Sequence, residues 1–102
     1  MRLFVLFDLP VKTKRDRRLY QKFHNFLVKD GYDMLQLSVY MRVTNGFDGV
    51  ETHLARLRRN LPPRGNVRAM VVTEKQYARM LVLVGEPTVQ EKTVGDQLQL
   101  WL

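Results

Sequence analysis

The sequence contains no cysteine among its 102 residues. Without thiols the chain has no disulfide framework, no cysteine-based zinc site and no thiol nucleophile. It also has no apolar run approaching about 18 residues, so we expect no transmembrane helix. The apolar run near the N-terminus is too short for a secretory signal and ends in Asp-Leu-Pro rather than in small residues. These absences predict a soluble cytoplasmic protein without a membrane partner.

Acidic residues are scarce in most of the chain. Residues 1–85 carry 16 Lys and Arg against 7 Asp and Glu, whereas residues 86–102 carry one Lys against three acids. The formal net charge is +7 and the pI is about 10.1. A basic body of this kind favours a polyanionic partner, most simply a nucleic acid.

The first element is predicted to be a central strand. Residues 3–7 are all apolar with no polar alternation, which is typical of a strand covered on both faces. Pro10 cannot donate a hydrogen bond to a sheet, so the strand ends near Asp8. Alternation places Asp8 on the same face as Phe4 and Leu6, at the exit of the strand.

Two helices and further strands follow. Thr13 is followed three residues later by the acid Asp16, which is close to a capping box, and Gly31 stands where a helix ends, so a helix is predicted between them. A second apolar stripe at helical spacing runs from Phe47 to Leu61 and ends at Pro62-Pro63. Further strands are predicted over residues 33–43, 66–73 and 79–84, with a short connection at residues 74–78.

This order predicts an α+β fold, a ferredoxin-like sandwich with an antiparallel sheet and both helices on one face. Residues 1–84 form the core, and residues 85–102 form a connector with a strand at 97–102 that pairs with its own sheet or with a neighbouring edge. The first strand is apolar on both faces, yet the helices cover only one. We therefore expect a homodimer in which a second copy covers the other face.

Asp8 is the first candidate functional residue. An ionised carboxylate at a strand exit needs a partner, because burying it alone costs several kcal/mol. One interpretation is that Asp8 caps the following loop or pairs with a lysine. The other is that it ligates a metal.

A second candidate is the basic surface of the helices. Few acids accompany these cations, so the pattern indicates phosphate contacts, although a solvated helix face is the alternative. An RNA-recognition motif is disfavoured because the strand "NVRAMVV" has no aromatic residue. His24 and His53 are predicted to lie at the surface or at the border of the core, and the tyrosines to pack in it. The predicted phosphate-contacting residues are Lys14, Arg15, Arg17, Arg18, Lys22, Arg56 and Arg59.

Four segments together resemble a known family over essentially the whole chain. They are "FDLP", "TKRDRRLYQKF", "LQLSVYMR" and "NLPPRGNVRAMVVTEKQYARM". In this order and at this length they resemble the small CRISPR-associated adaptation proteins, the second member of that nomenclature, often described as endoribonucleases. The sequence looks most like the members from type II systems.

The resemblance implies a ferredoxin-like homodimer whose two sheets face each other, with the Asp8 residues meeting near the two-fold axis. It implies that Asp8 is a magnesium ligand and the catalytic residue of a metal-dependent nuclease acting on RNA or DNA. It also implies that the dimer bridges CRISPR integrase dimers and binds double-stranded protospacer DNA for spacer acquisition. The implied interface residues are Ser38, Tyr40, Leu98, Leu100 and Trp101.

Two functional hypotheses remain at this point. The chain is a non-catalytic DNA-binding scaffold of the integration complex, or a metal-dependent phosphodiesterase, which as an alternative works independently of the integrase. The two hypotheses do not exclude each other. The basic helices favour the first hypothesis, and Asp8 permits the second.

Overall fold

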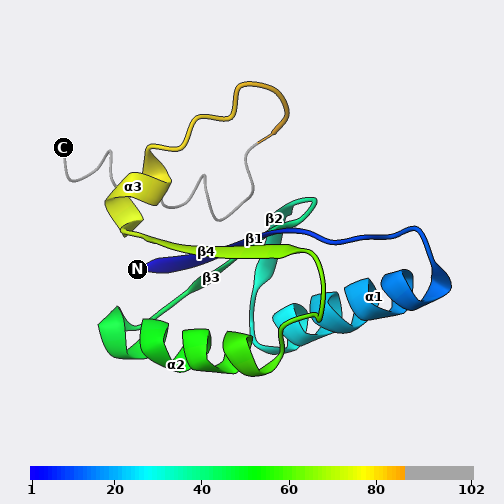
Figure 1. The fold of residues 1–102 in the computed structure, drawn as a ribbon. Helices are drawn as coiled ribbons and strands as arrows, with labels where there is room; N and C mark the ends of the chain where they lie inside the picture. The colour runs from blue at the N-terminus through cyan, green and yellow to red at the C-terminus, as the bar shows by residue number, and fades with distance from the viewer. Residues whose placement is uncertain (87–102) are drawn as a thin grey trace.

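A four-stranded antiparallel sheet organises residues 1–86, the part of the chain that the computed structural model describes (Figure 1). The strands are β1 (Arg2–Asp8), β2 (Asp33–Gln36), β3 (Val39–Val43) and β4 (Asn66–Val72), in the order β2-β3-β1-β4. The helices are α1 (Lys14–Lys29), α2 (Gly46–Arg59) and α3 (Glu74–Ala78). This is the predicted ferredoxin-like α+β fold.

The strand β1 is the centre of the molecule. It pairs with β3 on one side and with β4 along its whole length on the other. Leu3 and Val5 have no exposed surface, and Phe4 on the opposite face is also buried. The prediction of a central strand covered on both faces is confirmed.

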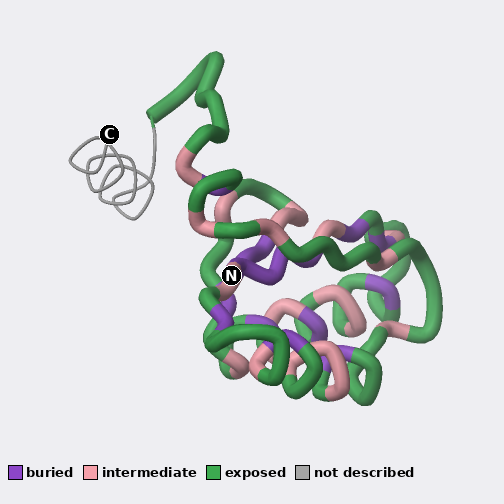
Figure 2. The backbone as a smooth tube through the Cα atoms, turned by 90° about the vertical axis from the view of Figure 1, so that its left-hand side faces the viewer, coloured by how far each residue is buried: buried purple, intermediate pink, exposed green. Residues whose placement is uncertain are grey.

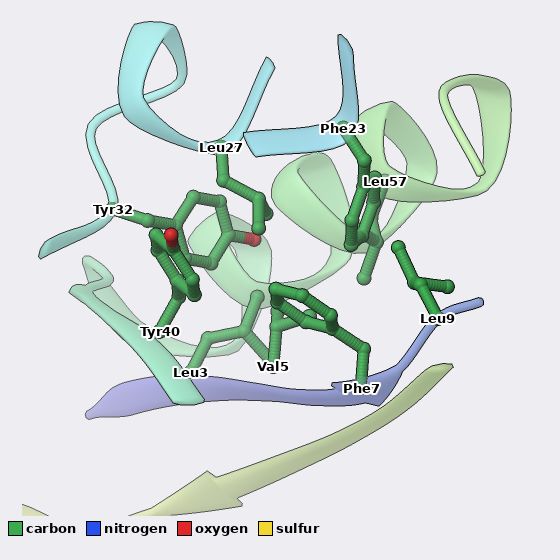
Figure 3. Packing of buried hydrophobic residues seen from close by; sticks show 9 residues of the cluster. All are labelled: Leu3, Val5, Phe7, Leu9, Phe23, Leu27, Tyr32, Tyr40 and Leu57. Carbon is green, nitrogen blue, oxygen red and sulfur yellow. The ribbon is translucent and has the colours of Figure 1, made fainter. Parts of the chain in front are cut away.

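The main core lies between the sheet and the two long helices (Figure 3). Leu3, Val5 and Phe7 of β1 pack there against Phe23 and Leu27 of α1. Leu57 of α2 closes the same cluster, so α1 and α2 cover one face of the sheet, as predicted (Figure 1).

The helix α1 begins and ends at the predicted residues. The Thr13 side chain accepts from the backbone N–H of Asp16, and the Asp16 carboxylate accepts from the N–H of Thr13. At the other end the N–H groups of Gly31 and Tyr32 donate to the carbonyls of Val28 and Leu27. Gly31 has φ +91°, the left-handed conformation that ends many helices.

The prediction of one strand over residues 33–43 is wrong. The segment is a hairpin of β2 and β3, and Ser38 at the turn has φ +64°. The Ser38 carbonyl accepts from the N–H of Phe7, which fixes the turn against β1. The alternation of faces survives the turn, because Leu35, Val39 and Met41 all contact the cluster on the sheet face opposite α1 and α2.

The helix α2 ends at Arg59, close to the predicted Pro62-Pro63 stop. Two residues of its predicted apolar stripe, Phe47 and Leu61, are exposed. Only the middle of that stripe, including Val50 and Leu57, is buried.

The face opposite α1 and α2 is partly covered by α3 (Figure 1). Tyr77 of α3 packs on Phe4 and Met41. The Arg2 guanidinium stacks on the Tyr77 ring at 4.1 Å, and its Nε donates to the Glu74 carboxylate at 3.1 Å. These contacts hold α3 to the start of β1.

The predicted strand at residues 79–84 is absent, and the predicted connection before it is α3. Thr73 and Gln76 form a second capping box, and this starts a helix immediately after β4. Residues 79–86 are exposed and form no strand (Figure 2). The predicted strand at 97–102, with Leu98, Leu100 and Trp101, lies outside the described residues. Within the described part, no helix is long and apolar enough to cross a membrane.

Tyr32 provides a test of the core. Its hydroxyl is buried without a hydrogen-bond partner among residues 1–86, and burial, followed by the charge of Asp30, raises the pKa of Tyr32 to about 12. We expect Tyr32→Phe to leave the free energy of unfolding unchanged or to raise it by up to about 2 kcal/mol. Above about pH 10 this tyrosine ionises only in the unfolded chain, so wild-type stability falls with rising pH, and the variant should lose less.

Urea denaturation at neutral pH and at alkaline pH measures both effects. Tyr40→Phe is the matched control, since the Tyr40 hydroxyl contacts Nδ1 of His24 and its loss should cost about 1 kcal/mol. A Tyr32→Phe protein that is destabilised as much as Tyr40→Phe would contradict this description of the core.

Candidate functional site

The carboxylate of Asp8 lies at the exit of β1 and is exposed. In the β1–β4 ladder Asp8 lies opposite Asn66, and Leu6 lies opposite Arg68. These residues, with Phe7, line an open groove of about 320 Å³. A carboxylate, an amide and a guanidinium group therefore lie along one groove at one end of the sheet.

Gly65, just before β4, allows the backbone to pass close to the end of β1. It has φ +94°, and a Cβ placed on it would lie 2.7 Å from the carbonyl oxygen of Asp8 and 2.7 Å from the side chain of Leu9. Both the backbone conformation and the lack of space require glycine here. Because Gly65 allows this close approach, β4 can begin beside the end of β1, where Asn66 pairs with Asp8.

The Asp8 carboxylate makes no hydrogen bond and no ion pair within residues 1–86. The alternative in which Asp8 caps the loop or pairs with a lysine is therefore not realised in the described part of the chain. An exposed carboxylate and a neighbouring amide are hard oxygen donors, which suit magnesium. The described residues bring together no group of three or more His, Asp or Glu, and Asp8 is the one carboxylate among the residues that line this groove.

The predicted basic surface lies on the helix layer. Lys14, Arg18 and Lys22 follow one another at four-residue spacing along α1, and Arg15 lies beside them; all four are exposed. Arg59 is exposed at the end of α2. In the described part of the chain none of these five cations forms an ion pair.

Two other predicted phosphate-contacting residues make contacts within the protein. Arg17 donates to the carbonyls of Val11 and Lys12 at 3.2 and 3.1 Å, which closes the loop before α1. Arg56 pairs with the Asp30 carboxylate at 3.0 Å. Both side chains remain exposed, so these contacts orient their guanidinium groups at the surface.

The two ends of α1 are joined to the segment around α2 by ion pairs. Asp30, after the last turn of α1, contacts Nδ1 of His53 at 2.9 Å and Arg56. Burial alone would raise the pKa of Asp30, but the hydrogen bonds from His53 and Arg56 outweigh it and lower that pKa. At the other end Arg64 lies 3.6 Å from Asp16. The basic side chains of both helices therefore occupy one layer of the molecule.

The two predicted interface residues within the described part differ. Ser38 is half-buried at the β2–β3 turn. Tyr40 is only 1 % exposed and packs in the core under α1, stacked on Phe7 (Figure 3). Its side chain therefore serves the core of this chain, and its predicted role at an interface stays a prediction, as does that of Ser38. His24 and His53 are both half-buried at the border of the core, as predicted.

Asn66 and Arg68 were not predicted from the sequence to lie in the groove. Both lie on β4, and only the pairing register places them beside Asp8. The available signal was Gly65, since a glycine before a strand indicates close approach of another backbone.

Comparisons with known proteins agree with one another. The family model described as "CRISPR associated protein Cas2" matches residues 1–80. A protein from Acidovorax ebreus is 56% identical over 95 residues, which is 93% of each chain. A protein from Campylobacter jejuni is 45% identical over 102 residues, covering all of this chain and 71% of that protein. Both proteins are named "CRISPR-associated endoribonuclease Cas2".

Gly65→Ala tests the construction of the Asp8 groove. The positive φ and the contact with the Asp8 backbone should together lower the free energy of unfolding by roughly 2–3 kcal/mol. Gly46→Ala is the control, because Gly46 also has positive φ but nothing lies within 4 Å of its added Cβ. Thermal denaturation should show a clearly larger loss for Gly65→Ala, and equal losses would contradict the close approach.

Proposed function

Because the chain belongs to the CRISPR-associated protein Cas2 family, we propose that it acts in CRISPR adaptation as a homodimer that binds protospacer DNA and carries a magnesium-dependent phosphodiesterase site at Asp8. The observation that carries this proposal is the sheet face opposite α1 and α2. That face is largely apolar, and Asp8 lies at its edge with no ion pair among the described residues.

The proposed occupant of this face is a second copy of the chain. α3 covers Phe4 and Met41, but Met70 and Val43 on the same face are about half exposed. A two-fold contact between two such faces would bury apolar surface that the helices leave open. It would also bring the two Asp8 carboxylates toward one axis, as the family resemblance implies.

Two carboxylates provide a better magnesium site than one. Magnesium keeps several waters and usually takes one or two carboxylates from a protein. When bound, it polarises a phosphodiester and supplies a nucleophilic water. Asp8 from each protomer would hold the ion, with Asn66 as a further oxygen donor at the same position.

The basic helices would contact the phosphates of duplex DNA. Their cations are exposed and follow the axis of α1, which suits a sequence-independent contact with a backbone. The proposed dimer then bridges integrase subunits while the duplex lies on its helix layer.

A second candidate function is an endoribonuclease that acts without the integrase. The names of the relatives support it, since proteins 56% and 45% identical to this chain are called endoribonucleases. The same Asp8 site would perform the reaction, so the two functions differ in substrate and partner rather than in chemistry.

Met70→Glu tests the dimer. Met70 is 51% exposed, so a charge there should leave the protomer folded but oppose burial of this face against a second copy. We expect light scattering to give a dimer for the wild type and a monomer for the variant at micromolar concentration. Val28→Glu on α1 is the matched control, with 53% exposure outside the proposed interface, and it should remain a dimer. A wild-type monomer would contradict both the dimer and the shared metal site.

Asp8→Asn tests the catalytic assignment. The amide keeps the shape of the side chain but removes the anionic ligand, so magnesium-dependent cleavage of RNA or DNA should fall at least about a hundredfold. The affinity for duplex DNA should stay within about twofold of wild type, since the phosphate contacts come from the helices. Retained magnesium-dependent cleavage by the pure variant would end the metal-ligand assignment.

A triple variant tests the basic surface and leaves Asp8 unchanged. It replaces Arg15, Arg18 and Lys22 by Gln. If the basic surface neutralises roughly four to six phosphates across the dimer, log K for duplex DNA should fall with log salt at a slope of about −4 to −5. The triple variant should flatten this slope while keeping metal binding at Asp8. An unchanged slope would place the DNA contact elsewhere on the protein.

A further inference from the structure

Among the described residues, Arg68 is the one cation that lines the groove beside Asp8, at the C-terminal end of β1. It is exposed, and within residues 1–86 it forms no ion pair and no hydrogen bond through its side chain. Side chains at paired positions of an antiparallel ladder point to the same face, so Arg68 and Asp8 share the face opposite α1 and α2.

The register makes the two residues diagonal neighbours. Asp8 lies opposite Asn66, and Arg68 is two residues further along β4. Diagonal positions of this kind are separated by about 7–8 Å, within reach of a long side chain. Asp8 and Arg68 nevertheless form no ion pair with each other, and both line the open groove of about 320 Å³.

The other arginine on this face has a structural role. Arg2, at the opposite end of β1, is buried and is held by Glu74 and the Tyr77 ring. Its contacts explain why a cation is present there. Within residues 1–86 no such contact holds Arg68, which lines the open groove beside Asp8.

From this geometry we infer that Arg68 binds the phosphodiester on which the Asp8 site acts, an inference that rests on the proposed function of that site. A carboxylate repels a phosphate, so Asp8 alone cannot hold a nucleic-acid substrate in the groove. A guanidinium binds two phosphate oxygens in parallel hydrogen bonds, which positions as well as attracts the group. The groove thus contains complementary parts, with oxygen donors for a cation at Asp8 and Asn66 and a phosphate-binding group at Arg68.

The assignment predicts effects of opposite sign on two ligands. Arg68→Gln should weaken binding of a short fluorescein-labelled single-stranded RNA, measured in EDTA so that no cleavage occurs, by about tenfold. The same variant should bind Mn²⁺, measured by electron paramagnetic resonance without RNA, two- to fivefold more tightly, because a nearby positive charge has been removed. A purely structural role for Arg68 would weaken both.

Asp8→Asn should show the reverse pattern. It should lose Mn²⁺ binding, and in EDTA it should bind the RNA as well as or better than wild type, since a negative charge has left the groove. Arg68→Lys keeps the charge without the paired hydrogen bonds, so its Mn²⁺ affinity should return to the wild-type value while its RNA affinity recovers only in part.

A double-mutant cycle separates the groove from general electrostatics. In Mn²⁺, the effects of Asp8→Asn and Arg68→Gln on RNA affinity should be coupled, since both act on one phosphate. Arg58→Gln on α2 removes the same charge on the other face of the sheet, and its effect should add to that of Asp8→Asn.

The outcomes distinguish failure of the metal site at Asp8 from failure of the phosphate-binding role of Arg68. If Asp8→Asn keeps its Mn²⁺ affinity, the proposed metal site at Asp8 is wrong. If Asp8→Asn loses Mn²⁺ but Arg68→Gln binds RNA like wild type, the metal site stands and the phosphate-binding role of Arg68 is overturned. Loss of both ligands in Arg68→Gln would also overturn it, because it would show that Arg68 maintains the shape of the groove.

Discussion

The need to cover β1 on both faces determines the rest of the structure. Its apolar residues point alternately to the two sides of the sheet, and the strand pairs along both edges, so it has no surface suited to water. Burial of a large apolar side chain contributes about 1.5–3 kcal/mol, which makes such a strand the obvious centre of folding stability. The helices α1 and α2 cover the apolar residues on one face of β1. On the other face α3 covers only part of the surface, and this incomplete cover is what the proposed dimer would complete.

The same constraint places the candidate site. A strand buried along its length can present polar side chains only where it ends, and Asp8 is its last residue. Gly65 lets the start of β4 pass against the Asp8 backbone, so the polar residues of both strands meet at one point. The site is therefore a consequence of the stable centre of the sheet, and its geometry depends on β-ladder hydrogen bonds rather than on a flexible loop.

Much of this arrangement could be predicted from the sequence where local patterns are strong. The capping box at Thr13, the C-terminal Gly31 and the unbroken apolar run of β1 each depend on nearby residues, and each was predicted correctly. The errors concern choices that local periodicity does not decide. A hairpin at Ser38 and a continuous strand have the same alternation, and the apolar residues after α3 have a strand-like composition but find no strand to pair with within the described residues.

The site was predicted only in part for a related reason. Asp8 is conspicuous because a carboxylate follows five apolar residues, whereas Arg68 is one of 17 basic residues and has no distinguishing neighbour in the sequence. What distinguishes it is the register with β1, a relation between residues about sixty positions apart. Tyr40 was selected from a motif as an interface residue, and its packing with Phe7 and its contact with His24 are tertiary relations that the motif does not reveal.

The distribution of charge makes the proposed binding of DNA compatible with the proposed formation of a dimer. A chain with a net charge of +7 would resist association with a copy of itself if its cations lay on the contact surface. In the described part of the chain most unpaired cations instead lie on the helix layer, and the sheet separates these from the apolar face, whereas Arg68 lies at the end of that face beside Asp8. Screening over about 8 Å at physiological salt leaves little of their repulsion across the intervening layers. A polyanion bound to the helix layer would remove most of what remains, so DNA binding on one side of the sheet and dimer contact on the other should reinforce each other.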